Sequence, residues 1–516
     1  MKKISTKIIL GLCTMALLFS SCSSELDTKP KVELSLENLL ANDPNAVQGL
    51  LSKMYGTLAL SGSKGPGSSD ISGADPGETA YLRSIINLQE FTADGMKNRW
   101  GDDGLDQLTT TSRWDPNNKF FRYLYDRVYY IVPQTTNIII ALGKVDVENK
   151  EQIISELRFI RALAYYTMID AFGKGVLVTN ENYGTSTPLP EASRQELFDY
   201  VESELLDIEG KIGLTNEYGR ANKSVVRMLL AKLYINAEVY TGTQRYSDAL
   251  TNINKVIGEG GYTLATSFVS QFSGDNYTST EIIFPLIADA VTSQSYGNTT
   301  YIVNGSCSTE TMNINDFGTS DAWTGHRATK AWYGLFGDLE TSTDDRAKLF
   351  WTEGHNYEME NYKTWTDGYP SVKFRNTNFS SPSISTPFSS TDFPMYRLAD
   401  AYLMYAECVL RGATGGTSQQ ALDYVNAIRN RSHAATITSG ELTLDFLLDE
   451  RARELNFEGH RRTDLIRFGK FTGGSYLWPW KGNAVNGAAI PDTYKVFPIP
   501  STALQSNPNL SQNSGY

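Results

Sequence analysis

The chain has 516 residues, of which 41% are hydrophobic and 20% are charged, and its 46 basic and 58 acidic residues give a net charge of −12. This composition is typical of a globular protein and excludes extensive disorder or a fibrous repeat. The acidic excess argues against nucleic acid as a partner, because no surplus of Lys and Arg is available to neutralise phosphates. Tyr (29) outnumbers Phe (22), which suits surfaces where an apolar ring must also carry a polar group.

The N-terminus has the pattern of an export signal. Lysines precede an apolar run over residues 8–19, and this run is too short to span a bilayer. It leads into the sequence Phe-Ser-Ser-Cys at residues 19–22, which resembles a bacterial lipobox. We therefore expect residues 1–21 to be a lipoprotein signal peptide and Cys22 to carry a lipid anchor. The alternative is an ordinary secretory signal followed by an incidental cysteine.

Apolar residues recur at helical spacing through much of the chain. The pattern predicts helices over residues 151–172, 195–208, 221–240, 246–257 and 398–410. The second of these opens with Ser and Glu three residues apart, in the arrangement of a capping box.

Three of the predicted helices share an Ala-x-x-Tyr element, which begins at Ala162, Ala231 and Ala399. The first two copies lie 69 residues apart, close to two periods of about 34 residues, the length of a tetratricopeptide-type helical pair. We therefore predict a mainly α fold built from tetratricopeptide-like helical repeats. The third copy falls outside this period, which indicates an insertion before it.

A loop-rich insert accounts for that interruption. Residues 260–393 are rich in Ser, Thr, Gly, Asn and aromatic residues and lack long helical periodicity, which predicts loops and short elements. We expect residues 22–516 to form a single domain, in which residues 22–259 and 394–516 are the helical scaffold. A glycine-rich loop is also expected over residues 61–77. Long loops on a rigid scaffold are where binding residues often lie.

The sequence carries no motif that predicts catalysis or a cofactor. Only four histidines occur, far apart in the chain. No zinc-protease, serine-hydrolase, phosphate-loop or Cys-x-x-Cys motif stands on a suitable element. We therefore expect no catalytic residues, no metal ligands, no cofactor and no enzymatic activity. A glycoside hydrolase with a carboxylate pair is the alternative enzyme class, because acidic residues are abundant.

One acidic segment requires a choice between catalysis and structure. Glu450, Glu454 and Glu458 recur at four-residue spacing among arginines within residues 449–465. Glutamates and arginines at helical spacing pair with each other. We therefore interpret these glutamates as one helix face with structural ion pairs.

The same segment resembles the characteristic helix of the SusD/RagB family of outer-membrane lipoproteins. It reads DERARELNFEGHRRTDLIRFGKF over residues 449–471, and three further stretches agree with it: SELRFIRALAYYTMIDAFG at 155–173, MYRLADAYLMYAE at 395–407 and VFPIP at 496–500. The resemblance runs from the lipobox to the C-terminus. It implies tetratricopeptide-like helical pairs and a role in binding a nutrient at the cell surface. It also implies delivery of that nutrient to a SusC-like, TonB-dependent outer-membrane transporter.

A sugar presents an apolar C–H face and a rim of hydroxyls, so its site combines aromatic platforms with polar side chains. In the starch-binding branch of the family, an Arg, a Trp and a polar side chain three residues beyond the Trp contact the glucan. The matching residues here are Arg83, Trp100 and Asp103. Asp103 replaces the amide of that branch, which puts its hydrogen-bonding role in question.

The same branch completes an arc of aromatic residues around the sugar. Tyr296 and Trp323 of the insert match these positions, and Tyr301 is an alternative to Tyr296. The resemblance therefore implies a noncatalytic lipoprotein that binds an α-glucan, either starch or malto-oligosaccharides, because a curved arc fits a helical glucan better than a flat chain. A peptide-binding member of the same family is the other alternative.

Overall fold

The computed structural model describes residues 35–516 with the exception of Gly73, Asp102 and Asp103. The predicted signal peptide and the predicted anchor Cys22 therefore lie outside the described residues. Within the described residues, no helix is both long enough and apolar enough to cross a membrane.

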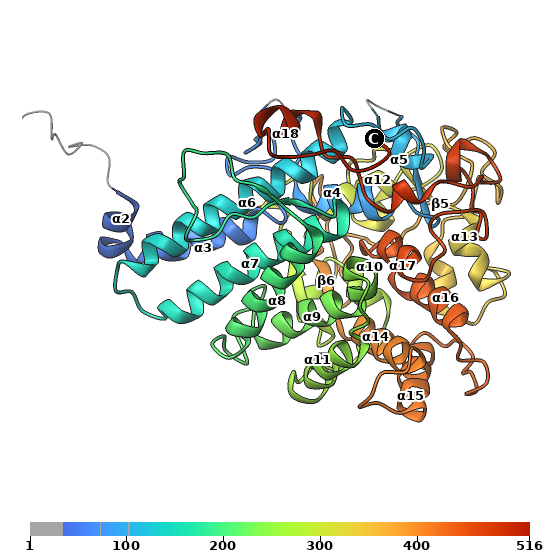
Figure 1. Cartoon of the computed structure of the whole chain (residues 1–516). Coiled ribbons are helices and arrows are strands. Elements are labelled where there is room, and N and C mark those ends of the chain that lie inside the picture. The colour runs from blue at the N-terminus through green and yellow to red at the C-terminus, as the bar shows by residue number, and fades with distance from the viewer. Residues whose placement is uncertain (1–34, 73, 102–103) are drawn as a thin grey trace, which may run out of the picture.

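The described chain is mainly helical, with three small two-stranded sheets (Figure 1). The helices are α2 (Leu36–Asn42), α3 (Pro44–Gly56), α4 (Tyr81–Gln89), α5 (Leu105–Thr109), α6 (Lys119–Gly143), α7 (Lys150–Ala171), α8 (Arg194–Glu209), α9 (Lys223–Ile235), α10 (Ala237–Thr241), α11 (Tyr246–Glu259), α12 (Thr299–Ser306), α13 (Lys330–Tyr333), α14 (Leu398–Leu410), α15 (Ser418–Arg431), α16 (Leu444–Leu455), α17 (Arg461–Arg467) and α18 (Ser501–Ser506). The strands are β1 (Met96–Asn98), β2 (Gly175–Val176), β3 (Glu191–Ala192), β4 (Ile282–Leu286), β5 (His326–Ala328) and β6 (Phe393–Arg397).

Successive long helices pack side by side to form the scaffold. Contacts join α6 to α7, α7 to α8, α8 to α9, α9 to α11 and α11 to α14, and the ribbons cross the molecule in that order (Figure 1). The Ala-x-x-Tyr elements lie on α7, α9 and α14, and their alanines, Ala162, Ala231 and Ala399, are fully buried. Alanine at such positions lets neighbouring helices approach closely. The predicted mainly α fold of stacked helical pairs is confirmed.

Several predicted helices begin and end where local chemistry indicates. The helix predicted over 195–208 is α8, and Ser193 and Glu196 form both hydrogen bonds of a capping box. The helix predicted over 221–240 is wrong as a single element, because it divides at Asn236 into α9 and α10. Asn236 Nδ2 donates to the Lys232 carbonyl (2.9 Å), and this side-chain bond competes with continuation of the helix.

Loops, short helices and strands fill the chain between α11 and α14. Strand β4 pairs antiparallel with β6 near the two ends of this region, and Leu398 N donates to the Glu281 carbonyl (3.0 Å). A second antiparallel pair joins β1 of the scaffold to β5 of the insert. The insert is therefore attached to the scaffold near its two ends, through β4 and β6, and again in its middle, through β5. We propose that scaffold and insert together form one domain.

The acidic segment at 449–465 is two helices rather than one. Helix α16 ends at Leu455, and Phe457 in the following turn has a positive φ of 72°. Glu458 therefore lies in a turn, off the face that carries Glu450 and Glu454. Among the described residues, the helix supplies one partner of its own, Arg453 for Glu450 (2.9 Å). The ion-pairing interpretation holds, but the predicted pairing along one helix face is wrong because most partners come from other elements.

Candidate functional site

The predicted aromatic residues converge where the insert meets α4 and β1. The ring centre of Trp323 lies 6.5 Å from that of Trp100 and 6.1 Å from that of Tyr296. Arg83, on α4, reaches the same place, with Nη1 3.4 Å from the Tyr296 carbonyl oxygen. Asp103, the remaining predicted residue, lies outside the described residues. We call Trp100, Trp323 and Tyr296 the aromatic arc.

Backbone pairing places the two tryptophans together. Strands β1 and β5 pair immediately beside them, and Arg99 N donates to the Gly325 carbonyl (3.1 Å). The indole Nε1 of Trp100 then donates to the Trp323 carbonyl (3.0 Å), which joins residues 223 positions apart. A short sheet and one indole hydrogen bond therefore bring the two tryptophans together, although they lie far apart in the sequence.

The rings of the arc are inclined to one another. The planes of Trp100 and Trp323 meet at 51°, and those of Trp323 and Tyr296 also meet at 51°. All three side chains are half-buried, so each ring is supported by the protein while part of it faces solvent. The Trp323 ring is therefore inclined to both of its neighbours, so the arc does not form one flat platform and it suits a ligand that bends.

Tyr301 lies beneath the arc instead of forming part of it. Its side chain is 0% exposed, and its hydroxyl donates to Asn87 Oδ1 (2.6 Å). The guanidinium of Arg83 lies 4.2 Å from the Tyr301 ring centre. Burial raises the pKa of Tyr301. Between the two tyrosines considered from sequence, Tyr296 is the accessible one, because Tyr301 is covered by the residues it supports.

His326 completes this supporting layer. Its ring is 0% exposed and lies 5.4 Å from the Trp100 ring and 4.7 Å from the Tyr301 ring, centre to centre. Burial, followed by the positive charges of Arg83 and Arg327, lowers the pKa of His326 well below its ordinary value. The ring is therefore neutral at physiological pH and acts as an aromatic support.

Sequence reasoning missed three neighbours of the arc: Asp321, His326 and Phe388. Asp321 Oδ2 accepts a hydrogen bond from Trp323 Nε1 (2.8 Å), and its position two residues before Trp323 was a usable local signal. Phe388 supports Tyr296 from a ring centre 5.2 Å away. Its place in a Ser- and Pro-rich loop carried no such signal, because only the fold brings that loop to Tyr296.

The characteristic segment recognised in the sequence holds the base of this site. Arg461 donates two hydrogen bonds to the carboxylate of Asp94, both 2.7 Å long. Glu90 Oε1 accepts a hydrogen bond from Gly459 N (2.7 Å). Asp94 and Glu90 are fully buried and lie in the short connection from α4 to β1, which leads to Trp100. The segment therefore holds the connection that leads to the arc.

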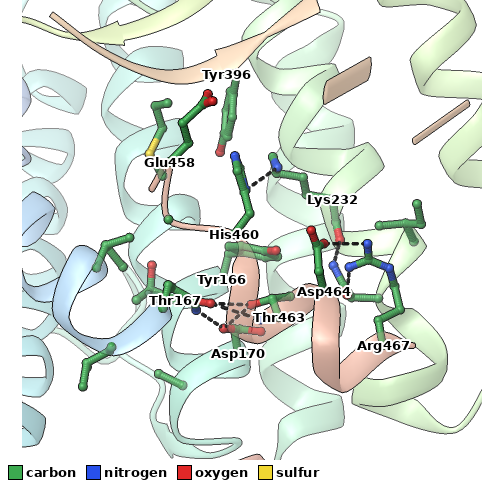
Figure 2. Close-up of a pocket in the computed structure, with 18 of the residues that line it drawn as sticks. Tyr166, Thr167, Asp170, Lys232, Tyr396, Glu458, His460, Thr463, Asp464 and Arg467 are labelled. Carbon is green, nitrogen blue, oxygen red and sulfur yellow. Dashed lines mark hydrogen bonds and ion pairs between the residues drawn. The ribbon is translucent and has the colours of Figure 1, made fainter. Parts of the chain in front are cut away.

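A small cavity lies beside the same segment, and Glu458, His460, Asp464 and Arg467 are among its lining residues (Figure 2). Its volume is about 60 Å³, which is space for about two water molecules. Arg467 pairs with Asp464 (2.7 Å) at its wall, and Lys232 approaches His460 Nδ1 (3.4 Å). Burial and the nearby Lys232 charge lower the pKa of His460 to about 3. The cavity is too small for a sugar and belongs to the polar core.

The acidic side chains of the characteristic segment form ion pairs in the described structure. In the described part of the chain, no three His, Cys, Asp or Glu side chains are grouped so that they could hold a metal ion. Glu450, Glu454 and Glu458 are buried and paired with arginine or lysine side chains. They are therefore withdrawn from any substrate.

Comparisons with known proteins agree on one family. The profile of the SusD family matches residues 236–516. The chain is 32% identical to the starch-binding protein SusD of Bacteroides thetaiotaomicron, over 96% of this chain and 96% of that protein. Its structure is similar to a SusD superfamily protein of Parabacteroides distasonis, with a TM-score of 0.72, 20% identity and coverage of 92% of this chain and 99% of the other. It is also similar to surface glycan-binding protein A of B. thetaiotaomicron in complex with laminarihexaose, with a TM-score of 0.70, 18% identity and coverage of 91% and 99%.

Proposed function

The chain belongs to the SusD family, and from this membership and the aromatic arc we propose that it is a cell-surface glycan-binding protein for starch or malto-oligosaccharides. The ligand class is supported by the 32% identity over 96% of the chain to a protein named for starch binding. In this proposal the protein hands its glycan to a SusC-like, TonB-dependent transporter in the outer membrane.

The observation that carries the ligand assignment is the inclination of the rings. A chain that rests its C–H faces on Trp100, Trp323 and Tyr296 must turn between successive contacts, because the Trp323 ring meets each of the other two rings at 51°. A malto-oligosaccharide curves in this manner, whereas a flat cellulose-like chain would leave at least one ring uncovered. Hydroxyl hydrogen bonds exchange with water and contribute little net free energy. The aromatic contacts should therefore supply most of the affinity.

We also propose that the protein binds without catalysis. Glycoside hydrolysis requires a pair of carboxyl groups that flank the scissile bond. In the described chain, the arc has one acidic hydrogen-bond partner, Asp321, and this carboxylate already accepts a bond from Trp323 Nε1. Incubation with amylopectin should therefore release no reducing sugar, and release above the level of a heat-denatured control would contradict this part of the proposal.

Isothermal titration of the wild type and of Trp100→Ala, Trp323→Ala and Arg83→Ala tests the site. Wild type should bind maltoheptaose or cyclodextrin with a dissociation constant between about 1 μM and 1 mM, which suits a protein that must release its ligand. Each Trp substitution should weaken binding by about tenfold or more. Arg83→Ala should weaken it less, because the Arg83 side chain is only 11% exposed.

A matched control is Tyr183→Ala, which removes another partly exposed aromatic ring and should leave affinity unchanged. Melting curves should show that both Trp variants are folded. Wild-type affinity in both Trp variants would refute the site. Binding of laminarihexaose in place of every α-glucan would refute the starch assignment while leaving a glycan-binding role.

We further propose that Cys22 is acylated and anchors the protein to the outer membrane. Cys22→Ala should move the protein from the membrane fraction to the soluble fraction without changing its fold, because anchoring depends on the acyl chains. A tagged wild-type protein extracted in mild detergent should also co-purify with a TonB-dependent transporter. Retention of the Cys22→Ala variant in washed membranes would contradict the anchor.

A further inference from the structure

A second hollow with exposed aromatic rings lies away from the arc, at the junction of the insert and the scaffold. Its volume is about 500 Å³, and Tyr218, Tyr277 and Ile287 line it together with polar side chains. Tyr218 is 45% exposed, Tyr277 is 61% exposed and Ile287 is 44% exposed. Large apolar side chains that gather in one surface hollow are candidates for ligand contacts. We call this site the Tyr218 hollow.

Tyr218 is held in place although it is exposed. Its hydroxyl donates to Asp392 Oδ2 (2.6 Å), across a separation of 174 residues. Asp392 is only 3% exposed, and its other oxygen accepts a hydrogen bond from Ala288 N (2.9 Å). A surface tyrosine usually loses rotamer freedom when a ligand covers it, whereas this ring is already fixed by a buried carboxylate. It is therefore a preorganised platform, which lowers the entropic cost of binding.

The apolar edge of the hollow is also fixed by packing. Gly219 follows Tyr218 with a φ of +78°, and a Cβ atom at this position would lie 2.4 Å from Ile287 Cδ1. The Ile287 side chain therefore lies close to the backbone of residue 219, and a Cβ atom there would force it to move. The hollow therefore receives apolar side chains from both the scaffold and the insert.

The polar rim contains hydrogen-bond acceptors and no cation. The polar lining side chains are Asp275, Thr278, Asp289, Asn378, Ser380, Ser381, Ser390 and Asp392. Asp289 Oδ1 accepts a hydrogen bond from Val291 N (2.9 Å). Within the described chain, Asp289 Oδ2 has no such partner, so it is available to a ligand hydroxyl. The absence of Lys and Arg from this lining disfavours phosphates and carboxylates, and the combination of rings with acceptors fits a neutral, polyhydroxylated ligand.

Two chain segments border both the hollow and the arc. One leads from Ile287 in the hollow to Tyr296 in the arc, and the other leads from Phe388, which packs on Tyr296, to Asp392 in the hollow. We propose that the Tyr218 hollow is a second glycan subsite, which binds another stretch of a polymer already held at the arc. This inference rests on the proposed function for its ligand class. Two linked weak contacts would raise affinity for a polymer above that for a short oligosaccharide.

The test removes the arc and asks whether the hollow still binds. In a Trp100→Ala/Trp323→Ala variant, saturation-transfer NMR with maltoheptaose or laminarihexaose should detect residual binding at about millimolar concentration. Adding Tyr277→Ala should abolish that signal, and adding Tyr183→Ala should not. In the otherwise wild-type chain, Tyr277→Ala should weaken amylopectin binding by about tenfold while leaving maltoheptaose affinity at the arc unchanged.

Each outcome decides between the two proposals. If wild type binds but the double Trp variant gives no saturation transfer, the second subsite is wrong and the proposed function stands. The Tyr218 hollow would then be interpreted as a contact surface for a protein. Residual binding that survives Tyr277→Ala also refutes the subsite. If Tyr277→Ala alone removes binding and the Trp substitutions do not, the hollow is a glycan site and the arc is not. No binding of either oligosaccharide by wild type contradicts both proposals.

Discussion

The aromatic arc and the charge network around α16 are opposite in character. The arc is half-exposed and its residues come from two distant segments, whereas Glu454 at the centre of the network is fully buried and is bound by Arg346 (2.9 Å), Arg397 (2.6 Å) and Arg431. The network coincides with the most recognisable stretch of the sequence. The comparison teaches that the strongest local pattern in this chain marks the part that holds the fold together, while the proposed binding surface is marked only weakly.

The network joins the insert to the scaffold. Arg346 and Lys373 belong to the insert, and they pair with Glu454 (2.9 Å) and Glu458 (2.6 Å) beside α16. Arg397, where β6 meets α14, pairs with both glutamates. Burying these charges has a large desolvation cost, which the multiple ion pairs offset only while every partner is present. Loss of one partner should therefore destabilise the protein strongly.

The largest expected effect comes from Glu454→Ala, which leaves buried arginines without a carboxylate. We expect a loss of about 3–5 kcal/mol in the free energy of unfolding, measured by chemical denaturation. Glycan affinity of the protein that remains folded should not change. Glu217→Ala is the matched control, because Glu217 is 78% exposed in its pair with Arg220, and it should leave the melting temperature nearly unchanged. A normal unfolding curve for Glu454→Ala combined with lost binding would reverse the roles of the two regions.

Acid should also affect the two regions differently, because it should reduce the stability that the charge network provides without changing glycan affinity at the arc. Partner arginines hold the pKa values of Glu454 and Asp464 below their usual range despite burial. Because these folded-state pKa values are depressed, the stability they contribute is present above about pH 4.5 and is lost as pH falls. Burial also lowers the pKa of His460 to about 3 and that of His326 well below its ordinary value. The stability that these two neutral rings contribute is therefore lost as pH falls below about 6.5.

Two buried carboxyl groups oppose this trend at milder pH. Burial raises the pKa of Glu90 to about 7 and that of Asp392 to about 6, so their contributions to stability increase as pH falls through those values. Stability should therefore change little between about pH 7 and 5 and then fall steeply below about pH 4.5. Denaturation curves across this range check the first expectation. Glycan titrations at the same pH values should show constant affinity. An affinity that follows the stability curve would contradict the assignment of stability to the charge network and of binding to the arc.

A smaller effect should distinguish the exposed layer of the arc from the buried layer beneath it. A Cβ atom on Gly325 would lie 2.5 Å from the Trp100 ring, and one on Gly305 would lie 2.2 Å from the His326 ring. Trp100 is half-buried and can move, so Gly325→Ala should weaken glycan binding by about tenfold with little change in melting temperature. His326 is fully buried, so Gly305→Ala should cost about 1–3 kcal/mol of stability through overpacking. If Gly325→Ala and Gly305→Ala lowered stability equally, the exposed arc and the buried layer beneath it could no longer be distinguished.

Local interactions made parts of this structure predictable from sequence. The capping box of Ser193 and Glu196 marks the start of α8 because both of its hydrogen bonds lie within one turn. The recurring Ala-x-x-Tyr elements indicated stacked helical pairs, because their small residues recur at the spacing of the repeat. The division at Asn236 was missed, since Arg467 from α17 also donates to Asn236 Oδ1 (2.9 Å) and this contact is not visible in the local sequence.

Sequence by itself determined the family, the helical scaffold and the residues that belong near the proposed site. Only the tertiary structure decided how those residues are used. Tyr296 and Tyr301 are the same residue type five positions apart, yet one is half-exposed and the other is fully buried. The difference arises because α12 turns Tyr301 inward to Asn87 and Arg83, more than two hundred residues away in the chain. Burial is set by such distant partners, and no local pattern contains them.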